Sequence, residues 1–259
     1  MGQIFPFDRD SLDLADPDQI VERVRELKPG LIVNAAAYTA VDRAESEPEL
    51  AMRINADAPR ILAEEALRLG AVLIHYSTDY VFDGTKPVPY VEADAPNPIN
   101  VYGKSKLEGE RGILATGCRH LILRTSWVYG ARGANFLLTM LRLARERREL
   151  RVVDDQIGAP TWCRDIAAAT ARASAGGIEG LFHLTARGKT SWCGFARKIL
   201  EIAGIATPVI PISSNEFRSV AKRPANSLLS CAKLKTFGIE LADWSHSLSA
   251  CFADGAIPG

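Results

Sequence analysis

Short, continuously apolar runs alternate along this chain with longer amphipathic stretches, and this alternation constrains the fold more than any other feature of the sequence. The runs are rich in Val, Ile and Leu, as expected of strands buried on both faces. They span 31–33, 71–76 and 120–123. Helical periodicity fills the intervals at about 17–27, 48–69, 101–115 and 135–148. This order predicts βαβ units, and therefore an α/β fold with a doubly wound parallel sheet and helices on both faces.

The pattern loosens after about residue 155. Beyond that point we expect a helix near 162–175, a short strand at 181–184, a helix near 191–203 and two short C-terminal helices. A chain of 259 residues is long enough for one large domain with an appendage, because a typical domain has roughly 150 residues. We therefore predict a first domain over 1–155 and a smaller α/β lobe over 156–259 that packs over the ligand site.

Charge and composition exclude several classes of protein. Lys and Arg together number 31, as do Asp and Glu, and this balance argues against a general binder of nucleic acid or of acidic membranes. No apolar run is long enough to predict a membrane span, and the first residues lack the cationic start and apolar core of a secretion signal. The 5 cysteines are scattered without zinc spacing. We therefore expect a cytoplasmic protein with reduced thiols and no structural metal.

The most informative segment lies at 100–110. Tyr102 and Lys106 stand four residues apart on a predicted helix, so that their side chains share one face. A neighbouring ammonium favours the phenolate, and we expect it to lower the pKa of Tyr102 below its usual value of about 10. Tyr102 is therefore a candidate acid or base, although the pair alone is equally consistent with an exposed helix surface.

Polar groups follow two of the predicted strands. The strand at 71–76 leads into Ser77, Thr78 and Asp79, and the strand at 120–123 leads towards Trp127. Because the carboxyl ends of parallel strands meet at one edge, these groups and the Tyr102 helix are expected to converge on a single rim, where ligands bind in such sheets. Trp127 is as well explained by a core aromatic as by a sugar platform. His75, on an apolar strand, is better explained as a satisfied core residue than as a catalyst.

Six longer motifs, in this order along the chain, together resemble those of the dTDP-4-dehydrorhamnose reductases, an extended branch of the short-chain dehydrogenases/reductases. They are NAAAYTAVD at 34–42, STDYVFDG at 77–84, YGKSKLEGE at 102–110, RTSWVYG at 124–130, QIGAPT at 156–161 and RPANS at 223–227. The resemblance covers nearly the whole chain. It implies a Rossmann-like, NAD(P)-binding first domain over 1–155 and a substrate-binding lobe over 156–259.

The resemblance also implies an activity. Hydride would pass from NADPH or NADH to the C4 ketone of dTDP-4-dehydro-6-deoxy-L-mannose, and the product would be dTDP-L-rhamnose for cell-surface polysaccharide synthesis. The expected partner is therefore a dTDP-linked deoxyketosugar, with a homodimer as a further possibility for the family. Some members dimerise through magnesium. The sequence has no local carboxylate cluster that identifies such a site, so we predict no metal.

Matching the motifs residue by residue assigns roles. Tyr102 would be the catalytic acid, Lys106 its activator and a ligand of the nicotinamide ribose, and Thr78 the hydroxyl that completes the triad. Thr78, Asp79 and Trp127 would border the sugar. The residues expected to bind the cofactor are Asp13, Leu14, Ala37, Tyr38 and Thr39, together with Tyr102 and Lys106.

The sequence departs from the family pattern at its start. Family members open with a strand, a glycine-rich G-x-x-G-x-x-G turn and a helix whose N-terminus receives the cofactor pyrophosphate. This sequence opens instead with residues that resemble the family's second strand, as if about 25 residues were absent. We expect a misplaced gene start or a truncation, with loss in a degenerate relative or replacement by a partner's strand as the alternatives. Without the amides and helix N-terminus of that turn, we expect the chain as given to be poorly soluble or to lack measurable NAD(P)H binding.

Two other functions stay open. An epimerase of the same superfamily would keep its nicotinamide oxidised and tightly bound, whereas a dehydratase would require an acid where Tyr80 stands. A non-catalytic nucleotide-binding subunit is the alternative from another class, because a regulatory subunit of methionine adenosyltransferase is similar to these reductases. Intact Tyr102, Lys106 and Thr78 favour the reductase.

Overall fold

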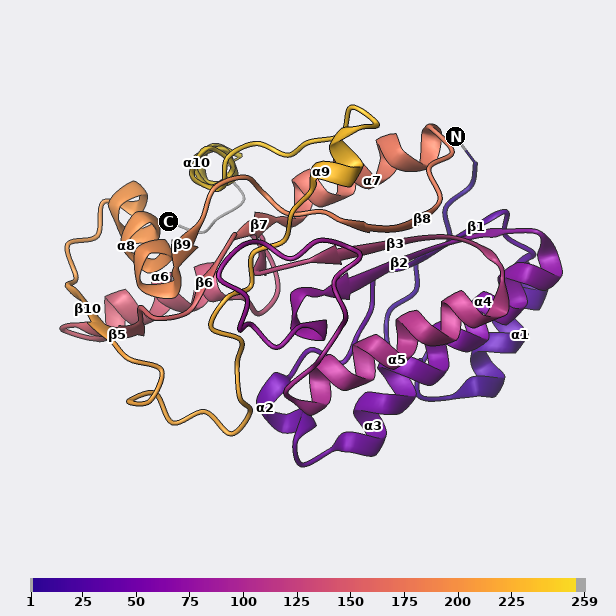
Figure 1. Ribbon diagram of the computed structural model, residues 1–259, viewed down its shortest axis with the longest axis horizontal. Coiled ribbons are helices and arrows are strands. Elements are labelled where there is room, and N and C mark those ends of the chain that lie inside the picture. Colours follow the sequence, from indigo (N-terminus) through magenta and orange to yellow (C-terminus); the bar gives the residue numbers. More distant parts are fainter. Residues whose placement is uncertain (1, 255–259) are drawn as a thin grey trace.

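Four parallel strands form the centre of the computed structural model, which describes residues 2–254 (Figure 1). Their spatial order is β1-β2-β3-β8, and every neighbouring pair is parallel. The strands are β1 (Leu31–Asn34), β2 (Val72–Thr78), β3 (Arg119–Thr125) and β8 (Gly180–His183). The α/β class and the Rossmann-like parallel sheet predicted from the alternation of strands and helices are therefore confirmed.

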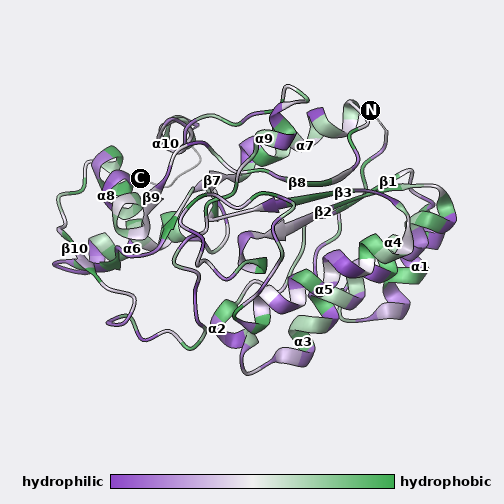
Figure 2. Ribbon diagram, viewed as in Figure 1, coloured by the Kyte–Doolittle hydropathy of each residue, from purple (hydrophilic) through white to green (hydrophobic). Residues whose placement is uncertain are grey.

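Helices cover both faces of this sheet (Figure 1). On one face lie α1 (Pro17–Leu27), α3 (Pro48–Met52), α4 (Ala58–Leu69) and α5 (Val101–Thr116). On the other lie α7 (Cys163–Ala175) and α9 (Ala232–Lys235). Side chains alternate across the strands, so that Leu73 and Ile122 pack with α1 and α4 whereas Ile74 packs with α7. Because one side of each covering helix packs on the sheet and the other faces outwards, hydrophilic and hydrophobic residues are mixed along these helices (Figure 2).

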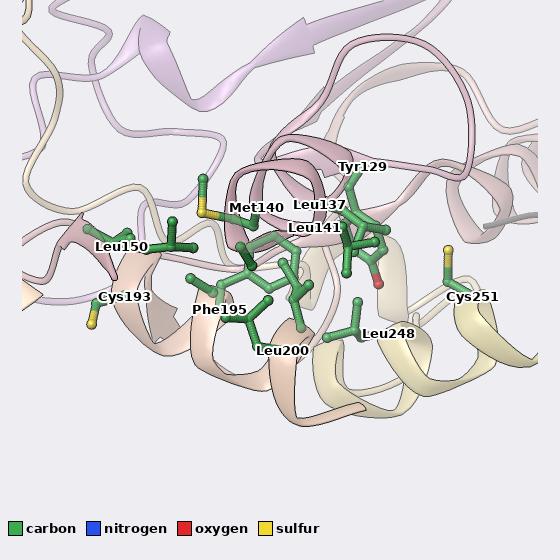
Figure 3. Close-up of a cluster of buried hydrophobic side chains, with 14 of the residues drawn as sticks. Tyr129, Leu137, Met140, Leu141, Leu150, Cys193, Phe195, Leu200, Leu248 and Cys251 are labelled. Atoms are coloured by element: carbon green, nitrogen blue, oxygen red, sulfur yellow. The ribbon is translucent and has the colours of Figure 1, made fainter. Parts of the chain in front are cut away.

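A second apolar cluster holds the smaller lobe together, as Figure 3 shows around Phe195, Leu200 and Leu248. It packs α6 (Phe136–Glu146), α8 (Trp192–Ala203) and α10 (Trp244–Ala253) against the parallel pair β5 (Leu150–Val153) and β10 (Val209–Ile212). The two halves of the chain are not cleanly separated. Helix α6, which precedes residue 155, packs in the smaller lobe, whereas α7 and β8, which follow it, pack with the central sheet. The boundary at residue 155 stays a prediction.

The remaining elements are short. They are α2 (Val41–Ala44), a π-helix at Arg53–Asp57, a 3₁₀ turn at Asp79–Val81, β4 (Val128–Tyr129), β6 (Ile157–Gly158), β7 (Thr161–Trp162) and β9 (Thr190–Ser191). The single helix expected at 48–69 is therefore three consecutive segments, α3, the π-helix and α4. Pro59 lacks the amide hydrogen that a regular helix needs at that point, and one widened turn before it accommodates the loss.

Strand β1 lies at one edge of the described sheet, and Leu31 and Val33 on it are 44% and 50% exposed. The expected missing strand stays a prediction. In the part of the chain that the structure describes, no helix is long and apolar enough to cross a membrane. Within residues 2–254, His, Cys, Asp and Glu side chains do not gather in a group that could hold a metal ion.

Close packing of α5 depends on Gly109. A Cβ at this position would lie 2.1 Å from the Asn55 carbonyl oxygen in the π-helix, and backbone cannot move aside as a flexible side chain can. We expect Gly109→Ala to destabilise the protein by about 1–3 kcal/mol, although alanine favours an isolated helix over glycine. Urea unfolding measures this. Gly112→Ala on the same helix, where the new Cβ would lie 2.9 Å from the Arg60 Cβ, should cost less because the overlap is smaller, and an equal cost would contradict the argument.

Candidate active site

Thr78 and Asp79 occupy the carboxyl end of β2, where the chain turns into the 3₁₀ segment. The Thr78 side-chain oxygen accepts a hydrogen bond from the Tyr80 amide at 3.1 Å, and its hydroxyl donates to Asp79 Oδ1 at 2.9 Å. Asp79 is only 3% exposed, and its Oδ2 has no hydrogen-bond partner among the described residues. Desolvation raises the pKa of this carboxyl to about 6, against the opposing effect of nearby hydroxyls.

Tyr102 is the second residue of α5, and the cap of this helix fixes its position. The Asn100 side chain caps the helix by accepting from the Gly103 amide at 2.7 Å, and it donates to the Lys222 carbonyl at 2.8 Å. The Tyr102 ring packs edge-on against the Tyr80 ring at 5.5 Å, which places the phenol near the carboxyl end of β2, where Thr78 stands.

The pKa of Tyr102 shifts in the direction opposite to the one expected from the sequence. Burial raises it to about 12, the nearby Thr78 hydroxyl opposes this rise in part, and the Asp79 carboxylate raises it further. The expected lowering by Lys106 is therefore wrong for this structure. The reason is that desolvation penalises the phenolate, and the Lys106 ammonium makes its contacts elsewhere.

Lys106 is 2% exposed and turns towards β2. Its Nζ donates to the Tyr76 carbonyl at 2.6 Å and lies 3.1 Å from His75 Nε2. Burial lowers the pKa of Lys106 to about 8, and the Glu110 carboxylate one turn further along α5 opposes this change. The lysine is therefore charged below about pH 8 and close to its titration at mild alkaline pH.

A buried ion pair joins α5, the helix of Tyr102 and Lys106, to the central sheet. Arg124 on β3 donates two hydrogen bonds to Glu110 on α5, at 2.8 and 2.6 Å, and the two side chains are 4% and 2% exposed. The Ser77 hydroxyl donates to Glu110 at 2.5 Å. These bonds tie α5 to both β2 and β3, and so fix Tyr102 and Lys106 relative to Thr78.

Trp127 is held at the rim between two partners. Its backbone φ is 48°, an unusual value for a bulky residue, and its ring stacks on Trp192 at 3.6 Å with an interplanar angle of 7°. A Cβ on Gly158 would lie 2.4 Å from the Trp127 ring, so only glycine fits there. Sequence analysis missed Trp192 and Gly158 as neighbours of this rim, because they lie far along the chain. The sugar-binding role of Trp127 stays a prediction.

The expected cofactor residues fall into two groups. Ala37, Tyr38 and Thr39 follow the carboxyl end of β1, and the Asn55 side chain clamps the Tyr38 backbone through bonds of 2.8 and 3.0 Å. Asn55 also donates to Ser105 on α5 at 3.0 Å, which ties this loop to the helix that carries Lys106. The hydrogen bonds of Asp13 and the packing of Leu14 lie instead in the segment before and around α1.

These residues fit one end of a nicotinamide dinucleotide. Ala37 and Thr39 carry small side chains, and Asn55 joins their loop to α5, where the ribose and nicotinamide would be held beside Tyr102 and Lys106. For the pyrophosphate, the described residues offer no glycine-rich turn between a strand and a helix. Asp13, Leu14, Ala37, Tyr38 and Thr39 stay predictions as cofactor ligands.

A Tyr–Lys pair on a helix, with a Thr hydroxyl at the end of the neighbouring parallel strand, defines a short-chain dehydrogenase/reductase. Within that class the chain belongs to the family described as the RmlD substrate binding domain, whose model matches residues 2–257. The family predicted from the six motifs is thereby confirmed.

Individual relatives agree with this assignment. The dTDP-4-dehydrorhamnose reductase of Burkholderia thailandensis is 47% identical over 98% of this chain and 91% of its own length. The protein of that name from Escherichia coli K12 is 45% identical over 94% and 87%. A crystal structure of dTDP-4-dehydrorhamnose reductase from Bacillus anthracis in complex with NADP has a TM-score of 0.94 and 39% identity, covering 96% of this chain and 89% of that one.

Proposed function

We propose that this chain is an NAD(P)H-dependent dTDP-4-dehydrorhamnose reductase that acts in the cytoplasm on the C4 ketone of dTDP-4-dehydro-6-deoxy-L-mannose and forms dTDP-L-rhamnose. The observation that carries the proposal is the position of Tyr102, whose ring packs against Tyr80 just after Thr78 at the carboxyl end of β2, on the helix that also carries Lys106. Relatives of that name that are 45–48% identical over nearly the whole chain support the substrate and the cofactor.

The raised pKa of Tyr102 suits a reduction. A phenol with a pKa of about 12 is protonated at neutral pH, and the developing alkoxide at C4 requires a proton donor. The bound nicotinamide supplies the hydride. Tyr102 gives its proton to the sugar oxygen, and Lys106, held by the Tyr76 carbonyl and His75, would bind the nicotinamide ribose.

Asp79 is proposed to hold the sugar. Its Oδ2, without a hydrogen-bond partner among the described residues, accepts a hydrogen bond from a sugar hydroxyl most strongly while the carboxyl is ionised, because a charged acceptor is stronger than a neutral one. Because the pKa of Asp79 is about 6, protonation weakens this acceptor as the pH falls through that value. We expect KM for the ketosugar to rise between pH 7 and pH 5, and steady-state kinetics over that range measure this. Asp79→Asn should flatten the pH dependence, and an unchanged profile in that variant would exclude Asp79 as its source.

The reductase activity is tested with purified protein, the dTDP-linked ketosugar and saturating NADPH or NADH. We expect oxidation of the cofactor and formation of dTDP-L-rhamnose in equal amounts. Protein that carries tightly bound NAD⁺ and isomerises a nucleotide sugar without consuming NADPH would identify an epimerase instead. Protein that binds nucleotide but converts no sugar would identify a regulatory subunit.

A further inference from the structure

Three buried polar side chains from three different elements form a continuous chain of contacts that ends at Lys106 of the proposed active site. Asn34 ends β1, His75 lies on β2 directly opposite it in the strand register, and Lys106 comes from α5. The Asn34 side-chain amide lies 3.1 Å from His75 Nδ1, and His75 Nε2 lies 3.1 Å from Lys106 Nζ. Their exposures are 5%, 0% and 2%, so water does not compete for these contacts.

The imidazole of His75 is suited to accept a hydrogen bond from the ammonium of Lys106. Burial, reinforced by the lysine's charge, holds the pKa of His75 well below its usual range, and the ring is therefore neutral at working pH. A neutral imidazole has one nitrogen that accepts. The Asn34 amide offers an N–H or, after a half turn, an oxygen, and can therefore pair with the other nitrogen in either tautomer. The satisfied core histidine expected from the sequence is thus satisfied by the lysine of the Tyr–Lys pair.

We propose that His75 is a positioning residue for Lys106, which lies on the same helix as Tyr102. Its Nε2 accepts a hydrogen bond from the Lys106 ammonium, and so stabilises the charged form of that group and fixes its location. Its catalytic consequence rests on the proposed reductase function. Apart from His75, the charged group that acts on Lys106 is Glu110 one turn further along α5, and Glu110 is itself paired with Arg124 on β3. The Tyr76 carbonyl is the second acceptor for the ammonium.

Removing the hydrogen-bond acceptor at His75 should lower the pKa of Lys106. His75→Leu leaves the buried ammonium with one protein acceptor, and desolvation then favours the neutral amine. His75→Gln can place its side-chain oxygen near the position of Nε2, whereas the shorter His75→Asn reaches only the side of Asn34. The proposal therefore predicts that His75→Gln keeps the pKa of Lys106 near its wild-type value, whereas His75→Asn, with an amide of similar polarity, lowers it.

The direct test is NMR titration of Lys106 in ¹³C-lysine-labelled protein without substrate, with the Lys106 resonance assigned from a Lys106→Arg sample. We expect the titration midpoint of Lys106 to fall by about one pH unit in His75→Leu and His75→Asn and to stay near wild type in His75→Gln. If His75→Leu fails to fold, the Gln and Asn variants still decide the question. Equal midpoints in Gln, Asn and wild type would overturn the proposal.

The kinetic test uses the same variants. The alkaline limb of the kcat profile should move to lower pH in His75→Leu and His75→Asn, with KM for the ketosugar nearly unchanged, and His75→Gln should restore the wild-type limb. Thr170→Val is the matched control, because it removes the 2.9 Å bond to the Tyr76 hydroxyl without touching Lys106. A shifted Lys106 titration in an inactive wild-type protein would refute the reductase function but not the role of His75. A uniform fall in activity at all pH values in all three variants would reduce His75 to a structural residue.

Discussion

Tyr102→Phe should lower kcat for the ketosugar by about 10²–10⁴-fold, because it removes the only proton that the proposed mechanism delivers to the C4 oxygen. The ring and its edge-on contact with Tyr80 at 5.5 Å are kept, so the site should retain its shape. Binding of NADPH and of the sugar should therefore change much less than turnover. Initial rates of NADPH oxidation at saturating substrate measure the effect, with the extent of folding checked by circular dichroism.

Tyr90→Phe serves as the control for this substitution. It also removes one phenol hydroxyl from a buried ring, since Tyr90 donates to Asp83 at 2.8 Å and stacks on Phe82. Its turnover should stay within a few-fold of wild type. Near wild-type turnover in folded Tyr102→Phe would show that another group protonates the alkoxide.

Glu110→Ala should destabilise the protein by about 3–5 kcal/mol, because it leaves the Arg124 guanidinium as a buried charge without a counter-ion. The two side chains are 4% and 2% exposed, so solvent screens this charge very little. Since the pair joins α5 to β3, the loss should also lower activity before global unfolding. Urea denaturation, followed by circular dichroism and by enzyme activity, measures both effects.

An exposed pair on the same helix provides the comparison. Arg111 and Glu108 form an ion pair of 2.6 Å with side chains 61% and 42% exposed, and Glu108→Ala should cost no more than about 1 kcal/mol. Replacing both Glu110 and Arg124 with methionine should recover most of the stability lost in the single variant. A double variant as unstable as Glu110→Ala would mean that packing, rather than the unpaired charge, explains the loss.

The course of the main strands and helices could be predicted from the sequence because it depends on local periodicity. The runs at 31–33, 71–76 and 120–123 became β1, β2 and β3, and the helix expected at 101–115 is α5. The break at 53–57 could not be predicted, since a π-helix turn differs from an α-helix by one residue and Pro59 is compatible with a helix start as well.

The chemistry of the site was harder to predict than its location. The convergence of Thr78 and Tyr102 followed from the rule that parallel strands end at one edge, but the pKa of Tyr102 depends on burial, which spacing along the chain does not reveal. The contact between His75 and Lys106 depends on the depth to which α5 packs against β2. A weak signal was present, because Asn34 and His75 are polar residues that directly follow runs of apolar residues in β1 and β2.

The central claim, that this chain reduces the C4 ketone, is tested most directly with NADPH deuterated at the transferable position. We expect the dTDP-linked product to be dTDP-L-rhamnose that carries one deuterium at C4, located by mass spectrometry and proton NMR, with one NADPH consumed per sugar. Conversion of the sugar without deuterium at C4, or no conversion at saturating NADPH by folded protein, would contradict the account.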